Sequence, residues 1–220
     1  VGLKAHNLIT RFPGSAFYVG ADGRAYIVAQ GVQPVSIPPV ETAIKSNSPQ
    51  ACFTYEDEGH TFCVITFSTG PAWVYDVALG EWHERSEGAA YGPWAASCSA
   101  KFGAKWYVGN LSADLCSLEV AQMDNGSDFI CEATSRTLYQ DGHRFTVPGL
   151  EIYPRRGFSA GNLTLRLSRD GGITWGAGKD RSYGPIGDFN DRVIWRALGQ
   201  FRQITAVIRA TNVAGFVMLA

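Results

Sequence analysis

Hydrophobic and polar residues alternate along much of the chain, most clearly in its C-terminal part. Leu163, Leu165 and Leu167 alternate with three polar residues, and this period of two marks a strand that buries one face. We therefore predict that residues 135–220 form an antiparallel β-sandwich of about five to seven strands. The same alternation predicts two further strands, one with Val193, Trp195 and Ala197 opposite Arg192, Ile194, Arg196 and Leu198, and one with Ile204, Ala206, Ile208 and Ala210 on a single face.

The first 120 residues contain a looser repeat, in which a strand, a glycine turn and an aromatic-rich strand follow one another. The second strands of the three copies lie at 25–28, 61–65 and 105–108. They begin roughly 35–45 residues apart, which is the spacing of four-stranded propeller blades. Because a closed propeller typically needs about 4–8 blades, we predict a partial or open propeller over residues 1–134. One short helix is expected at residues 40–46.

The charge of the chain is divided unevenly. The net charge is only −1, but residues 1–134 hold 7 basic and 14 acidic residues, whereas residues 135–220 hold 12 basic and 6 acidic ones. Eleven of those twelve basic residues are Arg, whose planar guanidinium suits bidentate contacts with carboxylates or phosphates. Two interpretations stay open, a basic sheet face in contact with solvent and an interface between unlike surfaces. The candidates for such an interface are Arg155, Arg156, Arg192 and Arg196.

The sequence pattern offers no catalytic, cofactor-binding or metal-binding residues. The five Cys lack the paired spacing of a zinc site, and the four His are dispersed. No nucleophile elbow, phosphate-binding loop or dinucleotide-binding glycine motif stands in a suitable setting. We therefore predict a protein that is not an enzyme and uses no cofactor. No apolar run of about 18 residues predicts a membrane span, and the cysteines favour assembly in a reducing cytoplasm.

One local motif is specific. Residues 168–175 match the Asp-box pattern S-x-D-x-G-x-T-W at every position. We expect a tight hairpin in which Asp170 accepts backbone N–H groups, Gly172 takes a positive φ, and Trp175 folds back over the turn. Asp boxes are typical of sialidases, where they stabilise turns away from the chemistry, so this single box is interpreted as structural. Its pattern residues are Ser168, Asp170, Gly172, Thr174 and Trp175.

A characteristic order of short segments runs through both parts of the chain. GHTFCVITF at 59–67 is followed by WVYD at 73–76 and EWHER at 81–85, and LRLSRDGGITW at 165–175 is followed by GPIG at 184–187 and RVIWRALG at 192–199. In this order the segments resemble the packaged-DNA stabilisation proteins of short-tailed bacteriophages, also called tail accessory factors or tail hub proteins. That family ends similarly, with a Gly-x-x-Gly turn before an Arg-Val-x-Trp-x-x-Leu-Gly strand.

The resemblance implies a structural virion protein with a propeller-like body and a β-sandwich. Six copies would form a ring below the portal and its adaptor, retain the packaged DNA and form part of its ejection channel. The implied partners are further copies of the chain, the portal and adaptor proteins, the tail needle or the tail fibres or spikes, and DNA by non-specific contact, without a membrane. Such a protein belongs to the virion tail and assembles in the cytoplasm of the bacterial host. This chain lacks most of the first half of the family's propeller.

Two alternatives stay open from the sequence. The Asp box alone would also fit a sialidase-like module that binds or cleaves glycans, and a host-recognition module at the tail tip could share this fold. A glycan array and a fluorogenic sialoside assay would separate these functions from a structural role.

Overall fold

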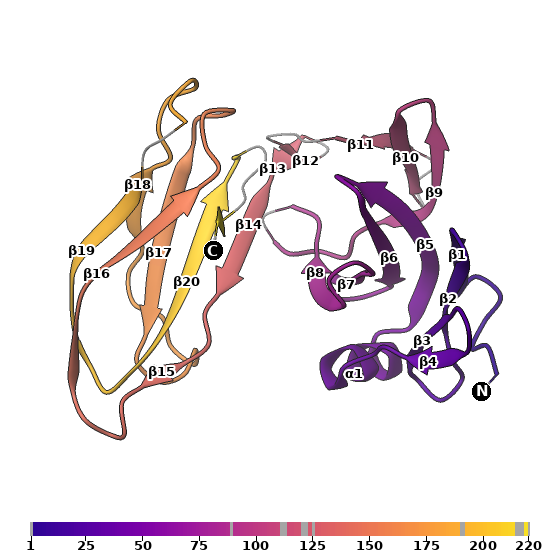
Figure 1. Cartoon of the computed structure of the whole chain (residues 1–220), viewed down its shortest axis with the longest axis horizontal. Helices are drawn as coiled ribbons and strands as arrows, with labels where there is room; N and C mark the ends of the chain where they lie inside the picture. Colours follow the sequence, from indigo (N-terminus) through magenta and orange to yellow (C-terminus); the bar gives the residue numbers. More distant parts are fainter. Residues whose placement is uncertain are drawn as a thin grey trace. The chain divides into compact units, whose positions relative to one another are not determined.

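The computed structural model describes residues 2–88, 90–110, 114–119, 123–124, 126–189, 192–213 and 218–219 of the 220-residue chain. Within these ranges the regular structure is almost entirely β-strand with one short helix, and all paired strands are antiparallel. The chain divides into two compact units, Val1–Glu119 and Val120–Ala220 (Figure 1). The predicted all-β fold class is confirmed.

Three antiparallel sheets follow one another in the first unit. In each sheet, strands that are adjacent in the sequence are also neighbours in space, so each sheet is an up-and-down meander like a propeller blade. The first sheet consists of β1 (Ile9–Phe12), β2 (Ser15–Val19), β3 (Ala25–Val28) and β4 (Val32–Pro34). The second consists of β5 (Pro49–Asp57), β6 (His60–Phe67), β7 (Ala72–Asp76) and β8 (Glu81–Arg85). The third consists of β9 (Ala96–Phe102), β10 (Lys105–Asn110) and β11 (Leu115–Leu118).

The first strands of these three sheets lie side by side, because β5 contacts both β1 and β9. Thr54 on β5 connects them. Its Oγ1 donates a hydrogen bond to the carbonyl oxygen of Arg11 on β1 at 3.1 Å, and its own carbonyl oxygen accepts one from Ser99 Oγ on β9 at 2.5 Å. Propeller blades likewise pack with their innermost strands around a common axis, so the prediction of propeller-like blades is confirmed.

Hydrophobic side chains fill the spaces between successive sheets of the first unit. Phe17 and Ile65 are fully buried between the first and second sheets, and Val64 and Val108 are buried between the second and third. Burial of each such side chain contributes about 1.5–3 kcal/mol to stability. The blades are therefore held together mainly by apolar packing.

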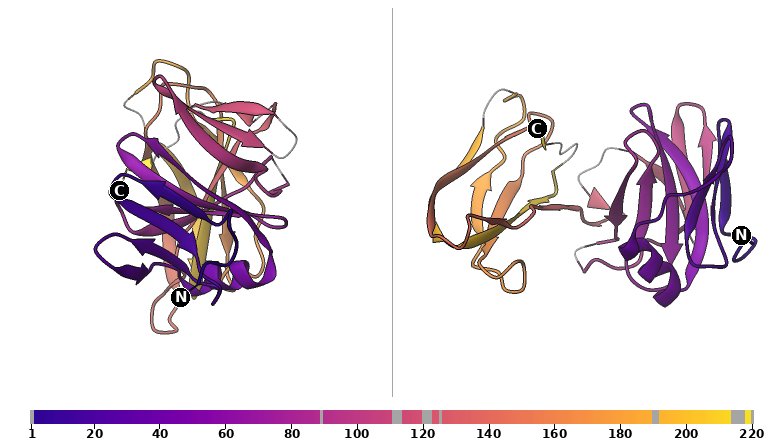
Figure 2. Two further views of the ribbon diagram at one scale, coloured as in Figure 1. Left: turned by 90° about the vertical axis from the view of Figure 1, so that its right-hand side faces the viewer. Right: turned by 60° about the horizontal axis from the view of Figure 1, so that its bottom comes forward.

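The helix α1 (Pro38–Ser46) joins the first two sheets and lies at one end of their strands (Figures 1 and 2). Its two prolines occupy the first turn, where their missing N–H groups are not needed for helical hydrogen bonds. Val40, Ala43 and Ile44 are buried, and their three- and four-residue spacing places them on one face. The helix starts two residues earlier than the sequence predicts.

The second unit contains two sheets that pack into a sandwich. One has the order β14-β20-β17-β18, with β15 also paired to β20, and the other has the order β19-β16-β21. A separate two-stranded ribbon consists of β12 (Met123–Asp124) and β13 (Ser127–Asp128). The strands of the sandwich are β14 (Ile130–Thr134), β15 (Leu138–Tyr139), β16 (Phe145–Pro154), β17 (Asn162–Ser168), β18 (Lys179–Ser182), β19 (Val193–Phe201), β20 (Gln203–Thr211) and β21 (Met218–Leu219).

The core of the sandwich is built from both sheets. Leu163 and Leu165 of β17 are fully buried, as the alternating pattern predicts, and they pack with Trp195 of β19. The Trp195 ring is inaccessible to solvent, and its Nε1 donates a hydrogen bond to the carbonyl oxygen of Lys179 at 2.7 Å. Because this donor is satisfied, the ring can be buried without the cost of an unpaired polar group.

The division between the units lies at 119/120, earlier than the expected division at 134/135. The reason is that β14 pairs with β20 from Ile130↔Thr211 to Thr134↔Val207 and so belongs to the sandwich. The charge separation is correspondingly smaller. Residues 1–119 hold 7 basic and 11 acidic residues, a net charge of −4, and residues 120–220 hold 12 and 9, a net charge of +3.

A β-bulge interrupts the alternation expected along β19. Its pairing with β16 moves from Val147↔Gly199 to Gly149↔Arg196, so β19 contains one extra residue at this point. Ala197 takes a φ of 56°, and the residues after it change faces. Leu198 is therefore buried and Ala197 exposed, the reverse of the sequence prediction, which assumed an unbroken period of two.

Candidate functional site

The Asp-box residues occupy the turn that follows β17. Asp170 Oδ1 accepts hydrogen bonds from Ser168 Oγ at 2.6 Å and from the Thr174 backbone N at 2.8 Å, and Oδ2 accepts one from Thr174 Oγ1 at 2.5 Å. Ser168 Oγ accepts the N–H of Gly172 at 2.8 Å. Gly172 has a φ of 96°, and the Trp175 ring lies 3.7 Å from the position that a Cβ of Gly172 would take.

These contacts define what the Asp-box turn can do. The hydrogen bonds from Ser168 and Thr174 lower the pKa of Asp170 to about 2, so this carboxyl group is ionised at neutral pH. Both of its oxygens are already used as acceptors within the turn. Thr174 is exposed and Trp175 is half-buried, so the turn lies at the surface, and Trp175 is not a core residue.

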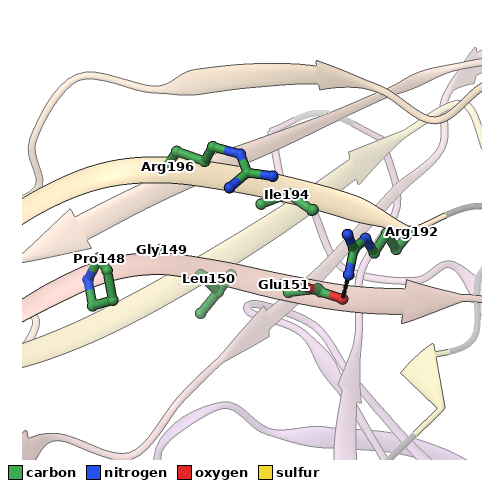
Figure 3. A pocket seen from close by; sticks show the side chains of 7 residues that line it. All are labelled: Pro148, Gly149, Leu150, Glu151, Arg192, Ile194 and Arg196. Carbon is green, nitrogen blue, oxygen red and sulfur yellow. Dashed lines mark hydrogen bonds and ion pairs between the residues drawn. The ribbon is translucent and has the colours of Figure 1, made fainter.

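Two of the four candidate arginines share one surface. Arg192 and Arg196 flank Ile194 on the exposed face of the sheet, next to β16 (Figure 3). Arg192 Nη1 donates a hydrogen bond to Glu151 Oε1 at 2.8 Å, and Tyr153 Oη donates one to the same oxygen at 2.5 Å. The Tyr153 and Arg192 hydrogen bonds lower the pKa of Glu151, so the face carries a stable negative charge beside its two positive ones.

Gly149 leaves a shallow depression in this face (Figure 3). A Cβ at Gly149 would lie 2.7 Å from the carbonyl oxygen of Trp195, so β16 and β19 approach too closely here for any side chain. Within the described residues Arg196 makes no hydrogen bond or ion pair, which leaves its guanidinium available to a binding partner. The depression has a volume of about 370 Å³ and is lined by Pro148, Gly149, Leu150, Glu151, Arg192, Ile194 and Arg196.

The other two candidate arginines lie in the loop after β16 and differ in burial. Arg156 is only 4% exposed, and its Nη2 donates a hydrogen bond to Asp188 Oδ2 at 2.6 Å. A Cβ at Gly184 would lie 1.7 Å from the same nitrogen, so only glycine leaves room for the guanidinium. Arg156 therefore connects two loops inside the fold. The expectation that it belongs to an exposed interface was wrong, because its charge is held by a carboxylate within the same unit.

Arg155 is exposed and lies beside an aromatic pair. Its Cζ is 5.0 Å from the centroid of the Phe158 ring, which in turn lies 5.7 Å from the Phe189 ring. Phe158 and Phe189 are 54% and 59% exposed, although aromatic rings are usually more deeply buried. Tyr183, which is buried, donates a hydrogen bond to the Arg155 carbonyl oxygen. The two loops thus present a surface with one cation and two exposed rings.

Sequence reasoning missed the acidic partners Glu151 and Asp188. They lie 41 and 32 residues from the arginines that they bind, and no spacing rule connects residues at that separation. The exposed phenylalanines were also missed, since a Phe in a glycine-rich segment looks like an ordinary core residue.

In the first unit a histidine and a carboxylate form a turn rather than a reactive site. Asp76 is 5% exposed, and its Oδ2 lies 2.7 Å from His60 Nδ1. Its Oδ1 accepts a hydrogen bond from the backbone N–H of Ala78 at 2.8 Å. Burial acts to raise the pKa of Asp76, but the hydrogen bonds from His60, Ala78 and Leu79 outweigh it, and the pKa is lowered. Asp76 therefore organises the hairpin between β7 and β8.

The described residues contain no group of three His, Cys, Asp or Glu side chains that could hold a metal ion. Among them, no helix is both long and apolar enough to cross a membrane. Cys52 and Cys63 are buried, and burial raises the pKa of both thiols, that of Cys63 to about 12. These two cysteines therefore act as small apolar side chains.

Residues 131–218 match the family model of the bacteriophage P22 Gp10 β-sandwich. The match begins in β14 and extends to β21, so it covers the sandwich and about two fifths of the chain. The second unit is thus similar to the β-sandwich of a bacteriophage protein. The match begins inside β14, the strand that the sequence prediction had placed in the first domain. It does not extend into the blade-like sheets.

No curated protein matches the sequence. Among solved structures, an exo-β-1,3-galactanase from Phanerochaete chrysosporium, with galactose, is similar over 93% of this chain and 63% of its own length, at 12% identity and a TM-score of 0.29. A glycoside hydrolase is similar over 89% of this chain and 69% of its own length, at 11% identity and a TM-score of 0.23. The chain thus spans less than two thirds of the galactanase, and similarity at these scores carries no argument about function.

Proposed function

We propose that this chain is a structural protein of the tail hub of a short-tailed bacteriophage. In this proposal it forms a six-membered ring below the portal and adaptor, retains the packaged DNA and forms part of its ejection channel. The observation that carries the proposal is the match of residues 131–218 to the P22 Gp10 β-sandwich. The ordered segments of the second sheet, at 59–67, 73–76 and 81–85, support it independently.

A ring needs two different surfaces on each copy, because every subunit contacts one neighbour with one surface and the next neighbour with the other. The face around Gly149 suits such a contact. It is exposed, it carries the Glu151–Arg192 pair, and Arg196 makes no hydrogen bond or ion pair with another described residue. The opposite net charges of the two units, −4 and +3, favour contact between unlike units of neighbouring copies.

The exposed rings of Phe158 and Phe189 support a second contact in the assembly. Aromatic residues and arginine are enriched where proteins bind each other, because they bury a large area with little loss of side-chain freedom. We assign this surface, together with Arg155, to a contact with the adaptor above the ring or with the needle, fibre or spike proteins below it. Localisation in the virion tail, after assembly in the host cytoplasm, follows from the same proposal.

A non-catalytic role is consistent with the Asp-box turn. Both oxygens of Asp170 accept hydrogen bonds from Ser168 or Thr174, so this carboxylate stabilises the hairpin. The proposal therefore does not include a glycosidase activity.

Mass photometry of the full chain tests the assembly directly. At micromolar concentration and low salt we expect a species six times the monomer mass of 23.9 kDa, and we expect salt to dissociate it because surface charges are screened. A monomer under all conditions, with and without purified portal and adaptor, would contradict the ring. Charge reversal at the face around Gly149, by Arg196→Glu, should weaken the ring. Arg166→Glu is the matched control, because Arg166 lies on β17 in the other sheet of the sandwich.

A further inference from the structure

Three arginines surround a second depression, at the end of the sandwich where β19 turns into β20. It has a volume of about 490 Å³ and is lined by Arg144, Arg169, Gln200, Phe201 and Arg202. Arg144 comes from the loop before β16, Arg169 from the Asp-box turn, and Arg202 from the turn between β19 and β20. These three segments lie together at the lower end of the sandwich in Figure 1.

Two of the arginines are held in place by neutral groups. The Arg169 guanidinium stacks on the Phe201 ring, with 4.6 Å from Cζ to the centroid, and its Nη1 donates a hydrogen bond to the carbonyl oxygen of Gln200 at 3.1 Å. The Arg169 carbonyl oxygen accepts a hydrogen bond from Gln203 Nε2 at 3.0 Å. Arg202 Nη1 donates one to the carbonyl oxygen of Gly142 at 3.0 Å. Carbonyl groups orient a guanidinium without cancelling its charge.

Among the described residues, no carboxylate lines the depression or pairs with its arginines. None of the three arginines forms an ion pair with another described residue, and the lining of the depression contains no acidic side chain. Arg144 also makes no hydrogen bond within the described ranges. A guanidinium has five N–H donors, so most of the donors around the depression remain available to an anion.

We propose that this depression binds a compact phosphate ligand with more than one negative charge, such as diphosphate or a sugar phosphate. The planar fork of Arg matches phosphate oxygens bidentately, and two preoriented guanidinium groups reduce the entropy lost on binding. The three charges converge on one depression of small-molecule size, about 300–1,000 Å³. A site for a polyanion would instead be a charged groove that follows the chain of phosphates.

The Asp box also holds one of the three arginines at the depression. The hydrogen bonds between Ser168, Asp170 and Thr174 fix the backbone on both sides of Arg169. The motif thereby positions this arginine at the depression. This inference is independent of ring formation, because it concerns residues of a single copy.

Isothermal titration calorimetry of the full chain with sodium diphosphate, at fixed ionic strength near neutral pH, tests the site. We expect a dissociation constant below about 1 mM. Arg144→Gln should weaken binding at least about tenfold, because a charge-assisted hydrogen bond is lost. The fold should be unchanged, since Arg144 is exposed and makes no hydrogen bond or ion pair with another described residue. Arg196→Gln, on the other depression, is the matched control and should bind as the wild type does.

The other arms distinguish the sources of the phosphate and the competing ligands. Glucose 1-phosphate that displaces diphosphate would support a sugar phosphate, whereas binding of diphosphate alone would support the free ion. Absence of binding at millimolar diphosphate, or equal weakening by Arg196→Gln, would overturn the proposal. A short DNA duplex could instead bind more tightly than diphosphate, with a slope of log K against log salt concentration that corresponds to more than about three neutralised phosphates. That result would overturn the proposal in favour of a nucleic-acid ligand.

Discussion

Asp188→Asn is the sharpest test of how the exposed loops are held. This substitution keeps the shape of the side chain and removes the negative charge that lies 2.6 Å from Arg156 Nη2. The guanidinium is only 4% exposed, so water cannot replace the lost carboxylate around it. Removal of one partner of a fully buried ion pair costs about 3–5 kcal/mol.

The expected cost is smaller here because the pair is not fully buried. The Asp188 side chain is 35% exposed, which allows solvent to screen the interaction, and an Asn amide oxygen can still accept one hydrogen bond. We therefore expect the free energy of unfolding of the sandwich to fall by about 2–3 kcal/mol. For a unit of this size, that change lowers the melting temperature by roughly 10–20 °C.

Thermal unfolding and hydrogen exchange measure this effect at two levels. The Gly187 N–H donates a hydrogen bond to the Gly157 carbonyl oxygen at 2.9 Å and connects the same two loops, so its exchange should accelerate in Asp188→Asn. Asp141→Asn is the matched control, since Asp141 is exposed, and it should change stability by no more than about 0.5 kcal/mol. Equal melting of the two variants, with unchanged exchange at Gly187, would refute the structural role assigned to the ion pair.

Four other substitutions test separate parts of the molecule. Trp195→Ala removes a fully buried ring and should lower the free energy of unfolding, measured by urea denaturation, by about 3–5 kcal/mol. Ala197→Gly relieves a φ of 56° and should leave stability unchanged or raise it by up to about 1 kcal/mol. Asp170 has a pKa of about 2 in the folded protein, below its ordinary 3.8, so the stability that its charge contributes is present above pH 3.8 and is lost as the pH falls through 2. Asp170→Asn should therefore flatten the dependence of stability on pH, measured by denaturation at a series of pH values. Arg196→Glu should leave melting unchanged but weaken self-association at low salt.

Wild-type stability of Trp195→Ala would place the ring outside the core, and a destabilised Ala197→Gly would mean that the bulge does not strain the backbone. An unchanged pH dependence in Asp170→Asn would assign the acid sensitivity to other carboxylates. Unaltered sedimentation of Arg196→Glu would leave this arginine as ordinary surface charge.

The strands of the chain were predictable where one face of a sheet is buried along its whole length. Leu163 and Leu165 show this, because the period of two follows directly from the pleat of β17. The pattern failed at Leu198, where one extra residue in β19 reverses the faces. A bulge depends on how two strands pair, and the sequence of one strand does not contain that information.

The candidate site was predictable only in part for a related reason. The high Arg content pointed to this unit, but the burial of Arg156 depends on Asp188 and on the space above Gly184, which only the folded chain brings together. Arg144 and Arg202 lie far apart in the sequence, and the sandwich places both at one depression. The domain division was misplaced because β14 joins its sheet through β20, near the end of the chain.

Electron cryo-microscopy of the intact phage tail is the decisive test of the proposed six-membered ring. We expect a six-fold layer below the portal and adaptor into which both the blade-like sheets and the sandwich fit. The face around Gly149 and Arg196 should then lie against a neighbouring subunit. Density for this chain at another position in the particle, or the absence of the chain from purified virions, would rule out the proposed role in the tail hub.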